Sequence, residues 1–370
     1  MKNKKIGAVI VAGGMSSRMR DFKPLLPIGS KSMIETTVEN YKQLGVEEIV
    51  VVTGYRSEDI EESLKEKNLN FIKNKHYNKT HMYDSVCLGL KELSEDTDYT
   101  FISPADSPFV QQFTLKKMVD EINISNHELI QPVYEGKDGH PIILKKEFFK
   151  IILEHDGTMG MQGVIKNNNK KCGKLSFVDQ GIVMDADRPN DYFKILEYNE
   201  IKNCPTVEIC EKIQKYFKIE DKVVLHSQKV TTVALDICEK LKKKGFKLNV
   251  NLLIAGGLLH DIGKGKVNHA KVGSKWLKSM GYEKLSDIVS EHMELKKIPK
   301  IPTEKEIIFL SDKLVKEDEI VTINERFENK KYLYEDNKKV LKIIERRKKQ
   351  AKEVYKLIFN NYELDDYKNK

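Results

Sequence analysis

The sequence is poor in cysteine, and its cysteines are not arranged in pairs. The 370 residues include five cysteines, an odd number, and no two of them stand in a Cys-x-x-Cys spacing. Disulfide frameworks and zinc ribbons both depend on paired cysteines at close spacing. We therefore expect no such framework. Five reduced thiols are predicted, at Cys87, Cys172, Cys204, Cys210 and Cys238.

Long apolar runs are also lacking. No stretch of the sequence approaches the roughly 18 apolar residues that indicate a membrane-spanning helix. The basic N-terminus is followed by an apolar run, Ile6–Ala12, but this run ends at Gly13-Gly14. It is too short for the apolar core of a signal peptide. We expect a cytoplasmic protein without a membrane partner.

A basic stripe interleaved with aromatic residues is absent as well. Residues 1–200 hold 27 Lys and Arg against 30 Asp and Glu, a balance of −3, whereas residues 201–370 hold 37 against 26, a balance of +11. The basic residues of the second half alternate with acidic ones in helical patterns such as Lys338–Glu353. This pattern indicates a solvated helical surface, so we expect no nucleic-acid partner.

What the sequence does contain is two halves with different periodicities. In the first half, short apolar runs alternate with amphipathic segments, which predicts a Rossmann-like α/β fold with a mostly parallel sheet. The expected strands are Ile6–Ala12, Glu48–Thr53, Asn70–Lys73, Tyr99–Ser103 and Leu129–Val133. The expected helices are Ser32–Leu44, Asp59–Lys67, Ser85–Leu93 and Thr114–Ile124.

The second half carries the 3.6-residue period almost throughout and shows no strand signal, which predicts an all-α domain. The polar stretch Tyr198–Pro205 marks the boundary, giving domains of residues 1–198 and 199–370. The expected helices are Val207–Tyr216, Ser227–Lys243, Val250–His260, His269–Ser279, Leu285–His292, Glu304–Val315 and Lys338–Asn360.

The first candidate site begins where the strand Ile6–Ala12 runs into Gly13-Gly14. Glycines at such a turn let backbone N–H groups approach a phosphate, although a purely structural turn fits equally well. Two cations, Arg18 and Lys23, follow within ten residues of the turn. They suit a triphosphate, whose charge must be neutralised as pyrophosphate leaves.

Two later segments add carboxylates to this site. Asp106 follows a strand and stands between prolines, and Asp187 belongs to the acidic run 184–191. Two carboxylates together with phosphate oxygens can hold Mg²⁺. The alternative for Asp106 is a helix N-cap.

Together these segments resemble the MobA-like NTP transferase family over residues 5–197. The matching motifs are VAGGMSSRMRDFKPLLP, NKHYNKTHMYDSVCLGL, PADSP, GHPI and DADRPNDY. The resemblance implies transfer of a nucleotidyl group from CTP or GTP to a molybdopterin-type phosphate acceptor, whose product would serve a molybdenum hydroxylase apoenzyme. It assigns the nucleotide to Ala12, Gly13, Gly14, Arg18, Lys23 and Asp106, catalysis to Arg18, Lys23 and Asp106, and Mg²⁺ to Asp106 and Asp187.

Three residues depart from the family pattern: Arg20, His81 and Arg188. His81 bears on the acceptor, which is therefore less securely assigned than the chemistry. The base also stays open, because the Gly13-Gly14 pair resembles the guanylyl branch, whereas MYDSVCLGL and the GHP turn favour CTP. A sugar- or alcohol-phosphate nucleotidyltransferase is the alternative, since KPLLPIG occurs in that wider superfamily too.

The second candidate site is a set of histidines and aspartates in the helical half. The dipeptide His260-Asp261 follows an apolar helix that glycine breaks, so both side chains can turn towards one ion. Imidazole with carboxylate suits Mn, Fe, Co, Ni or Zn rather than Mg²⁺. A single histidine on such a helix would usually be a core residue whose hydrogen bonds are satisfied, but this explanation does not account for the whole set. The candidate ligands are His226, His260, Asp261, His269, His292 and Asp312.

This set resembles the HD superfamily of metal-dependent phosphohydrolases over residues 205–320. The resemblance implies that His226, His260, Asp261 and Asp312 hold one divalent metal, and that His269 and His292 hold a second. Lys264, in the HDIGK run, would act in catalysis by contacting a substrate phosphate. The substrate stays open among phosphomonoesters, cyclic phosphodiesters, nucleoside triphosphates and dinucleoside polyphosphates. The alternative is a non-catalytic module that senses a nucleotide.

Overall fold

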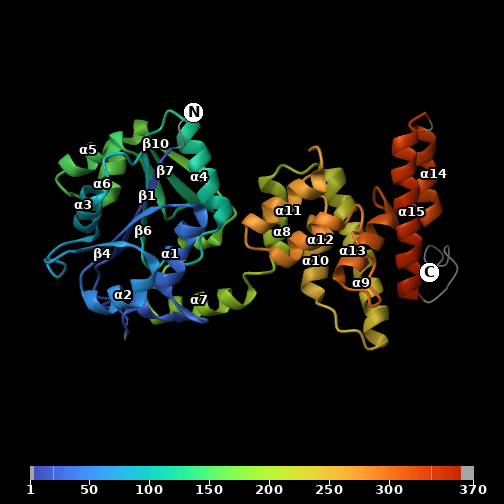
Figure 1. Ribbon diagram of the computed structural model, residues 1–370, viewed down its shortest axis with the longest axis horizontal. Helices are drawn as coiled ribbons and strands as arrows, with labels where there is room; N and C mark the ends of the chain where they lie inside the picture. Colours follow the sequence, from blue (N-terminus) through green and yellow to red (C-terminus); the bar gives the residue numbers. More distant parts are fainter. Residues whose placement is uncertain (1–3, 20, 335, 360–370) are drawn as a thin grey trace. The chain divides into compact units, whose positions relative to one another are not determined.

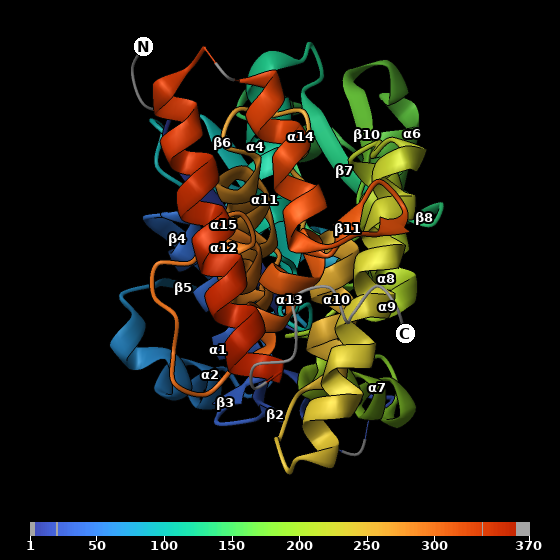
Figure 2. The same ribbon diagram turned by 90° about the vertical axis from the view of Figure 1, so that its right-hand side faces the viewer.

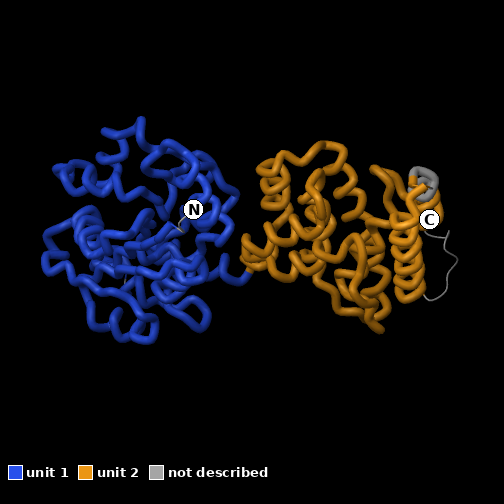
Figure 3. The backbone as a smooth tube through the Cα atoms, turned by 45° about the horizontal axis from the view of Figure 1, so that its top comes forward, with its two compact units in different colours: residues 1–200 blue, residues 201–370 orange. Residues whose placement is uncertain are grey.

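The computed structural model describes residues 4–19, 21–334 and 336–359. The chain divides into two compact units, Met1–Glu200 and Ile201–Lys370, which Figure 3 shows in two colours. Within the described residues, no helix is both long and apolar enough to cross a membrane. All five cysteines are free thiols, as predicted.

The first unit is built on one sheet with the strand order β10-β7-β9-β6-β1-β4-β5 (Figure 1). Strands β5, β4, β1 and β6 are mutually parallel; β9 is antiparallel to both of its neighbours, and β10 is parallel to β7. The predicted mostly parallel α/β fold is therefore confirmed. The bounds are β1 Ile6–Ala12, β4 Glu48–Thr53, β5 Asn70–Lys73, β6 Tyr99–Pro104, β7 Leu129–Tyr134, β8 Lys137–Asp138, β9 Ile142–Lys145 and β10 Cys172–Ser176.

The helices of this unit cover the sheet because the central strands are apolar on both faces. Val9 of β1 is fully buried, and helix α3 lies so close to it that a Cβ on Gly89 would stand 2.3 Å from the Val9 side chain. Helix α1 begins with a capping box at Ser32 and ends at Gly45, which adopts the left-handed conformation. The helices are α1 Met33–Leu44, α2 Ser57–Leu64, α3 Met82–Glu92, α4 Gln112–Ile124, α5 Glu147–Glu154, α6 Gly160–Asn167 and α7 Pro189–Ile201.

Short elements complete the unit. Two-residue strands β2 and β3 form a small hairpin after the glycine loop. Single turns of 3₁₀ helix connect several of the longer elements. Their bounds are β2 Pro27–Ile28, β3 Lys31–Ser32, η1 Lys23–Leu25, η2 Lys65–Lys67, η3 Asn169–Lys171 and η4 Gln180–Val183.

The second unit is helical, as predicted, and Figure 2 shows its last two helices side by side. Helices α9, α10, α12 and α13 pack on one another and form its core. The helices are α8 Val207–Tyr216, α9 Asp221–Lys243, α10 Val250–Leu259, α11 His269–Ser279, α12 Glu283–Glu291, α13 Glu304–Lys313, α14 Ile323–Leu333 and α15 Lys338–Phe359.

One expectation for this unit is wrong: it contains strands. Strands β11 (Val315–Lys316) and β12 (Glu319–Ile320) form an antiparallel hairpin in which Val315 pairs with Ile320. The turn between them is only two residues long, and Glu317 takes a positive φ of 57° there. Two-residue strands are too short to show an alternating pattern, so the sequence gives no signal for them. Asn360, the predicted end of the last helix, lies outside the described residues.

Candidate active sites of the two units

The glycine loop of the first unit lies at the carboxyl end of β1. Ala12 and Gly13 are buried and Gly14 is exposed. A Cβ on Gly54, which follows β4, would stand 2.6 Å from the carbonyl oxygen of Gly13, so the two turns are in close contact. Farther along the loop, the Ser16 hydroxyl accepts a hydrogen bond from the Lys23 backbone N–H at 3.1 Å. This bond folds the loop back and brings Lys23 to the end of the sheet.

Lys23 joins the two predicted carboxylates. Its ammonium lies 2.7 Å from Asp187 Oδ1 and 3.5 Å from Asp106 Oδ2. Asp106 is held at the strand ends because the preceding residue, Ala105, donates its N–H to the Val11 carbonyl of β1. Arg18 also faces Asp187, at 3.5 Å, but its side chain is 69% exposed. An exposed ion pair of this kind is weak, so Arg18 is free to turn toward an anionic ligand.

A third carboxylate, Asp185, belongs to the same cluster. Burial, together with the charges of Asp106 and Asp187, raises the pKa of Asp185 to about 6. The hydrogen bond from Lys23 instead lowers the pKa of Asp187. The potential ligand atoms of Asp106, Asp185 and Asp187 are all carboxylate oxygens, which are the donors that Mg²⁺ prefers. The sequence shows Asp185 in the acidic run, but nothing in the run distinguishes it as a candidate ligand.

The GHP turn also reaches this site. Gly139 is required there because a Cβ would stand 2.6 Å from the Ile182 carbonyl oxygen. Burial lowers the pKa of His140, although the charge of Asp106 acts in the opposite direction. His140 Nδ1 is buried and has no hydrogen-bond partner among the described residues. A neutral imidazole therefore faces the carboxylate cluster.

The three residues that depart from the family pattern lie on the surface or outside the described chain. His81 is exposed at the start of α3, where its backbone N–H donates to Asp84 Oδ2 at 2.8 Å. Arg188 is exposed beside the acidic cluster and its charge lowers the pKa of Asp187 after the larger effect of Lys23. Arg20 is outside the described residues.

In the second unit, five elements bring all six predicted ligands together. His226 comes from α9, His260 and Asp261 from the end of α10, His269 from the start of α11, His292 from the end of α12, and Asp312 from α13. Their ligand atoms form two groups, one of His226, His260 and Asp261, the other of Asp261, His269 and His292, with all atoms of a group within 4.8 Å of one another. Asp261 belongs to both groups, as a residue between two metals would. Asp312 Oδ1 lies 3.2 Å from His226 Nε2.

Backbone carbonyls fix the orientation of three of these imidazoles. The Nδ1–H of His226 donates to the Glu317 carbonyl at 2.7 Å, that of His260 to the Gly257 carbonyl at 2.8 Å, and that of His292 to the Val289 carbonyl at 2.7 Å. Because a carbonyl can only accept, each ring keeps its Nε2 lone pair for the centre of the cluster. The hairpin of β11 and β12, which the sequence did not predict, helps to orient His226 because its turn contains Glu317.

The buried charges of this cluster are those of a metal site. Burial lowers the pKa of His260 to about 4, so its ring is neutral, and its Nε2 is buried without a hydrogen-bond partner among the described residues. Burial alone would raise the pKa of Asp312, but Lys313, His226 and Arg326 outweigh it and hold that pKa well below its usual range. Neutral imidazoles and ionised carboxylates are the forms that bind divalent cations. The residues present therefore fit one or two such ions.

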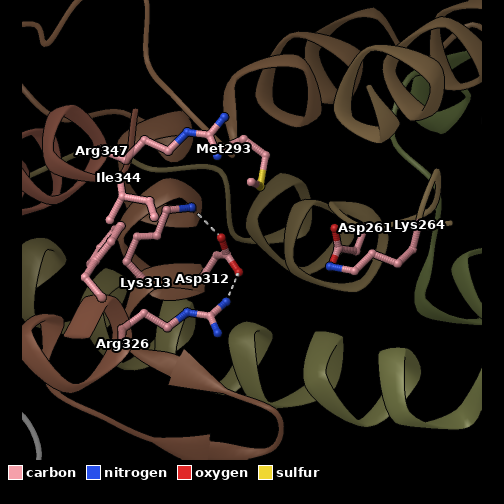
Figure 4. Close-up of a pocket in the computed structure, with 9 residues that line it drawn as sticks. Asp261, Lys264, Met293, Asp312, Lys313, Arg326, Ile344 and Arg347 are labelled. Atoms are coloured by element: carbon pink, nitrogen blue, oxygen red, sulfur yellow. Dashed lines mark hydrogen bonds and ion pairs between the residues drawn. The ribbon is translucent and has the colours of Figure 1, made fainter. Parts of the chain in front are cut away.

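A cavity of about 70 Å³ adjoins this cluster (Figure 4). Lys264, predicted from the HDIGK run, lines it and lies 2.7 Å from Asp261 Oδ2. Lys313, Arg326 and Arg347 line it too. They were not predicted, because no local motif surrounds the two arginines and Lys313 is singled out only by standing next to Asp312.

Both units match known protein families. Residues 8–172 match the family model of the MobA-like NTP transferase domain, and residues 223–317 match that of the HD domain. The chain contains a nucleotidyltransferase domain and an HD domain. These matches confirm the two domain resemblances, while the particular branch of each family is a separate question.

Curated relatives of the nucleotidyltransferase domain include proteins with different names. The chain is 26% identical over 198 residues to the molybdenum cofactor cytidylyltransferase of Escherichia coli, covering 53% of this chain and 98% of that protein. It is also 26% identical over 180 residues to the bifunctional protein GlmU of Staphylococcus saprophyticus, covering 47% of this chain and 39% of that protein. The chain thus spans nearly all of the first relative and well under half of the second.

Solved structures with a similar fold include a nucleotidyl transferase from Methanothermobacter thermautotroptrophicus. It is 20% identical with a TM-score of 0.48, and the match covers 54% of this chain and 99% of that one. A cytidylyltransferase from Leptospira borgpetersenii is 18% identical with a TM-score of 0.45, covering 58% of this chain and 95% of that one.

Proposed function

We propose that the protein is a bifunctional enzyme: a molybdopterin cytidylyltransferase joined to a metal-dependent phosphohydrolase. For the first activity, the supporting observation is the convergence of Lys23, Asp106 and Asp187 at the carboxyl ends of β1 and β6. Parallel α/β sheets bind ligands at this edge. The similarity to a molybdenum cofactor cytidylyltransferase over 98% of that protein's length supports the choice of acceptor.

In this proposal the chain's own residues position and neutralise the nucleotide. Backbone N–H groups of Ala12, Gly13 and Gly14 bind its phosphates, and Arg18 and Lys23 balance the charge that develops on the departing pyrophosphate. A terminal phosphate oxygen of the acceptor bonds to the α-phosphorus as the bond to the β-phosphate breaks. Asp106 and Asp187, with Asp185 beside them, would hold Mg²⁺, which supplies further charge neutralisation. Lys23 would exchange its bonds to these carboxylates for bonds to phosphate.

The base and the acceptor each have an alternative. GTP is the alternative base, because the Gly13-Gly14 turn resembles the guanylyl branch. A sugar- or alcohol-phosphate is the alternative acceptor, since relatives named GlmU match at the same identity as the molybdenum enzyme. If molybdopterin is the acceptor, a molybdenum hydroxylase apoenzyme is the expected recipient of the product.

The HD domain is proposed to hydrolyse a phosphate ester with one or two of Mn, Fe, Co, Ni or Zn. The observation that carries this proposal is the buried Nε2 of His260, which has no hydrogen-bond partner among the described residues and lies near Asp261 and Asp312, while the Gly257 carbonyl fixes its tautomer. His226, His260, Asp261 and Asp312 would hold one ion, and Asp261, His269 and His292 a second. A divalent metal supplies Lewis-acid chemistry that lowers the pKa of water and polarises a phosphate. Lys264 would bind the substrate phosphate.

The two activities are tested in separate experiments, the first of which concerns nucleotidyl transfer. Purified protein is incubated with Mg²⁺, each of the four nucleoside triphosphates, and either molybdopterin or sugar phosphates, and pyrophosphate release is measured. We expect release with CTP and molybdopterin; release only with a sugar phosphate would replace the acceptor, and none with any pair would contradict the transferase proposal.

For the HD domain, phosphomonoesters, cyclic phosphodiesters and nucleotides are offered with Mn²⁺. Hydrolysis that disappears on chelation is expected. Tight nucleotide binding without hydrolysis would instead show a sensing module.

A further inference from the structure

Helices α14 and α15 add a wall to the HD site that the family match does not include. The match ends at residue 317, whereas α14 spans Ile323–Leu333 and α15 spans Lys338–Phe359. Both helices pack against each other, and α15 also packs on α13, which carries Asp312 (Figure 2). Each contributes one arginine to the cavity beside the metal-ligand cluster, Arg326 from α14 and Arg347 from α15.

Arg326 is largely buried, Arg347 is partly buried, and both are only partly neutralised. Arg326 Nη2 lies 3.5 Å from Asp312 Oδ1, its side chain is 16% exposed, and its Nε has no hydrogen-bond partner among the described residues. Arg347 Nε lies 3.4 Å from Glu294 Oε2, with the side chain 29% exposed. These pairs are long for charge-assisted hydrogen bonds, so both guanidinium groups keep donors for a ligand.

The lining of the cavity carries more positive than negative charge. Lys264, Lys313, Arg326 and Arg347 stand against two carboxylates, Asp261 and Asp312, which leaves two positive charges in excess before any metal binds. Asp312 is also shared, since Lys313 Nζ contacts one of its oxygens at 2.5 Å and Arg326 faces the other (Figure 4). Lys313 and Arg326 are largely buried and share this one carboxylate. Buried cations without a full set of counter-charges are costly, so this part of the cavity favours an anion.

The size of the cavity narrows the class of anion. A volume of about 70 Å³ holds a few water molecules, since about 15 Å³ suffices for one. A single phosphate group fits that space, whereas a nucleoside would have to extend out of it. Arginine forks match the paired oxygens of a phosphate, and two of them suit a dianion better than a monoanion.

We propose that Arg326 and Arg347 bind the terminal phosphate of a phosphomonoester, so that the C-terminal extension makes the HD site a phosphomonoester site. The inference rests on the proposed hydrolase function and names its substrate class. In the complex, Arg326 turns part of its fork from Asp312 to the phosphate, and Arg347 reaches the phosphate from the other helix. A cyclic phosphodiester, with one charge, binds less tightly.

Phosphate binding tests this without depending on turnover. The full chain is loaded with Mn²⁺, and radiolabelled inorganic phosphate is measured by equilibrium dialysis, with bound metal determined by elemental analysis. The variants are Arg347→Gln and Arg326→Gln, with Arg326→Lys as the conservative change. Arg346→Gln is the matched control, because Arg346 pairs with the same Glu294 and loses the same charge but does not line the cavity.

We expect Arg347→Gln and Arg326→Gln to weaken phosphate binding by about tenfold or more, as loss of a charge-assisted contact does. Bound metal and the Arg346→Gln control should match wild type, and Arg326→Lys should recover part of the affinity. Unchanged phosphate affinity in both glutamine variants at full metal content would overturn the inference. So would competition by a cyclic phosphodiester as strong as that by a phosphomonoester. If these binding results hold but no ester is hydrolysed, the hydrolase function fails and the phosphate site stands.

Discussion

The two sites of this chain differ in how deeply their charged groups are placed. In the nucleotidyltransferase domain the cluster lies on loops after strand ends, and Asp187 is 52% exposed. In the HD domain the candidate ligands come from helices that pack together and from the ends of these helices, and Asp261 is 3% exposed. The first arrangement leaves room for a large substrate that brings its own phosphate oxygens. The second is already complete, as a resident metal requires.

The two sites also differ in the kinds of atoms that could bind a metal. The first cluster offers carboxylate oxygens and is partly neutralised by Lys23, whereas the second offers four imidazoles, three of them locked by carbonyls. Oxygen donors prefer Mg²⁺ and imidazoles prefer transition metals. We therefore expect the two activities to depend on different ions and to be removed independently.

The largest effect should follow from removing two candidate HD ligands, His260 and Asp261, of which Asp261 belongs to both groups. The double change His260→Ala and Asp261→Ala takes a ligand from each metal group and should abolish both bound transition metal and hydrolysis. Mg²⁺-dependent pyrophosphate release should stay within about twofold of wild type, since the two clusters use separate residues. Elemental analysis and both assays on one preparation measure this. A parallel loss of transfer would contradict the independence of the sites.

The next effect concerns Lys23. Lys23→Ala removes the cation that bridges the carboxylates and would balance the leaving pyrophosphate. We expect a loss of roughly 2–4 kcal/mol in transition-state stabilisation, comparable to deleting one oxyanion donor. The matched control is Lys31→Ala, because Lys31 is 46% exposed and pairs only with Glu39 among the described residues. Pyrophosphate release at the wild-type rate in Lys23→Ala would show that the loop has another role.

A smaller effect concerns how the stability of the nucleotidyltransferase domain depends on pH. Asp179 is buried between Gln111, Thr114 and Gly181, which donate hydrogen bonds to it, and burial raises its pKa from 3.8 to about 6. A carboxyl whose pKa is raised on folding stabilises the protein fully below its unfolded pKa, and this contribution is lost as pH rises through about 6. We expect the free energy of unfolding of a 1–200 fragment to fall by about 1–3 kcal/mol between pH 4 and pH 7.

Urea unfolding followed by circular dichroism at several pH values measures the slope of the free energy of unfolding against pH. Asp179→Asn should flatten it, even though the amide supplies fewer acceptors and lowers stability overall. The exposed Asp120→Asn is the control and should keep the wild-type slope. An equal slope in Asp179→Asn would show that other groups are responsible.

The smallest expected effect comes from separating the domains. Each unit has its own core and its own cluster, so fragments of residues 1–200 and 201–370 should keep transfer and hydrolysis within a fewfold of the full chain. Assays on well-folded fragments measure this. Loss of transfer in the first fragment would mean that the helical half completes the nucleotidyltransferase site.

Sequence reasoning predicted the parts of this molecule that local pattern determines. Strands β1, β4 and β5 have the predicted bounds because each has apolar residues at its centre and is followed by a turn residue. The six candidate ligands of the HD domain were predicted from the resemblance to the HD superfamily, and the structure brings them together. Strand β9 was missed because one antiparallel strand of four residues looks like any short apolar run.

The residues that sequence reasoning missed depend on tertiary packing. Arg326 and Arg347 belong to a half rich in basic residues, and no spacing distinguishes them from the solvated ones. Only the packing of α14 and α15 places them in the lining of the cavity beside Asp312. Asp185 is similar: it interacts electrostatically with Asp106, which lies far away in the sequence.

The central claim is that the HD domain is a metal-dependent enzyme, and the metal content of the wild-type protein tests it most directly. Protein purified without chelator should hold one or two Mn, Fe, Co, Ni or Zn per chain by elemental analysis. His269→Ala and His292→Ala should reduce two ions to one, because only the second group needs these histidines. The same protein should hydrolyse a phosphate ester with added Mn²⁺. A preparation that holds no such metal, and cleaves no phosphate ester with Mn²⁺ present, would contradict the claim and leave a binding module.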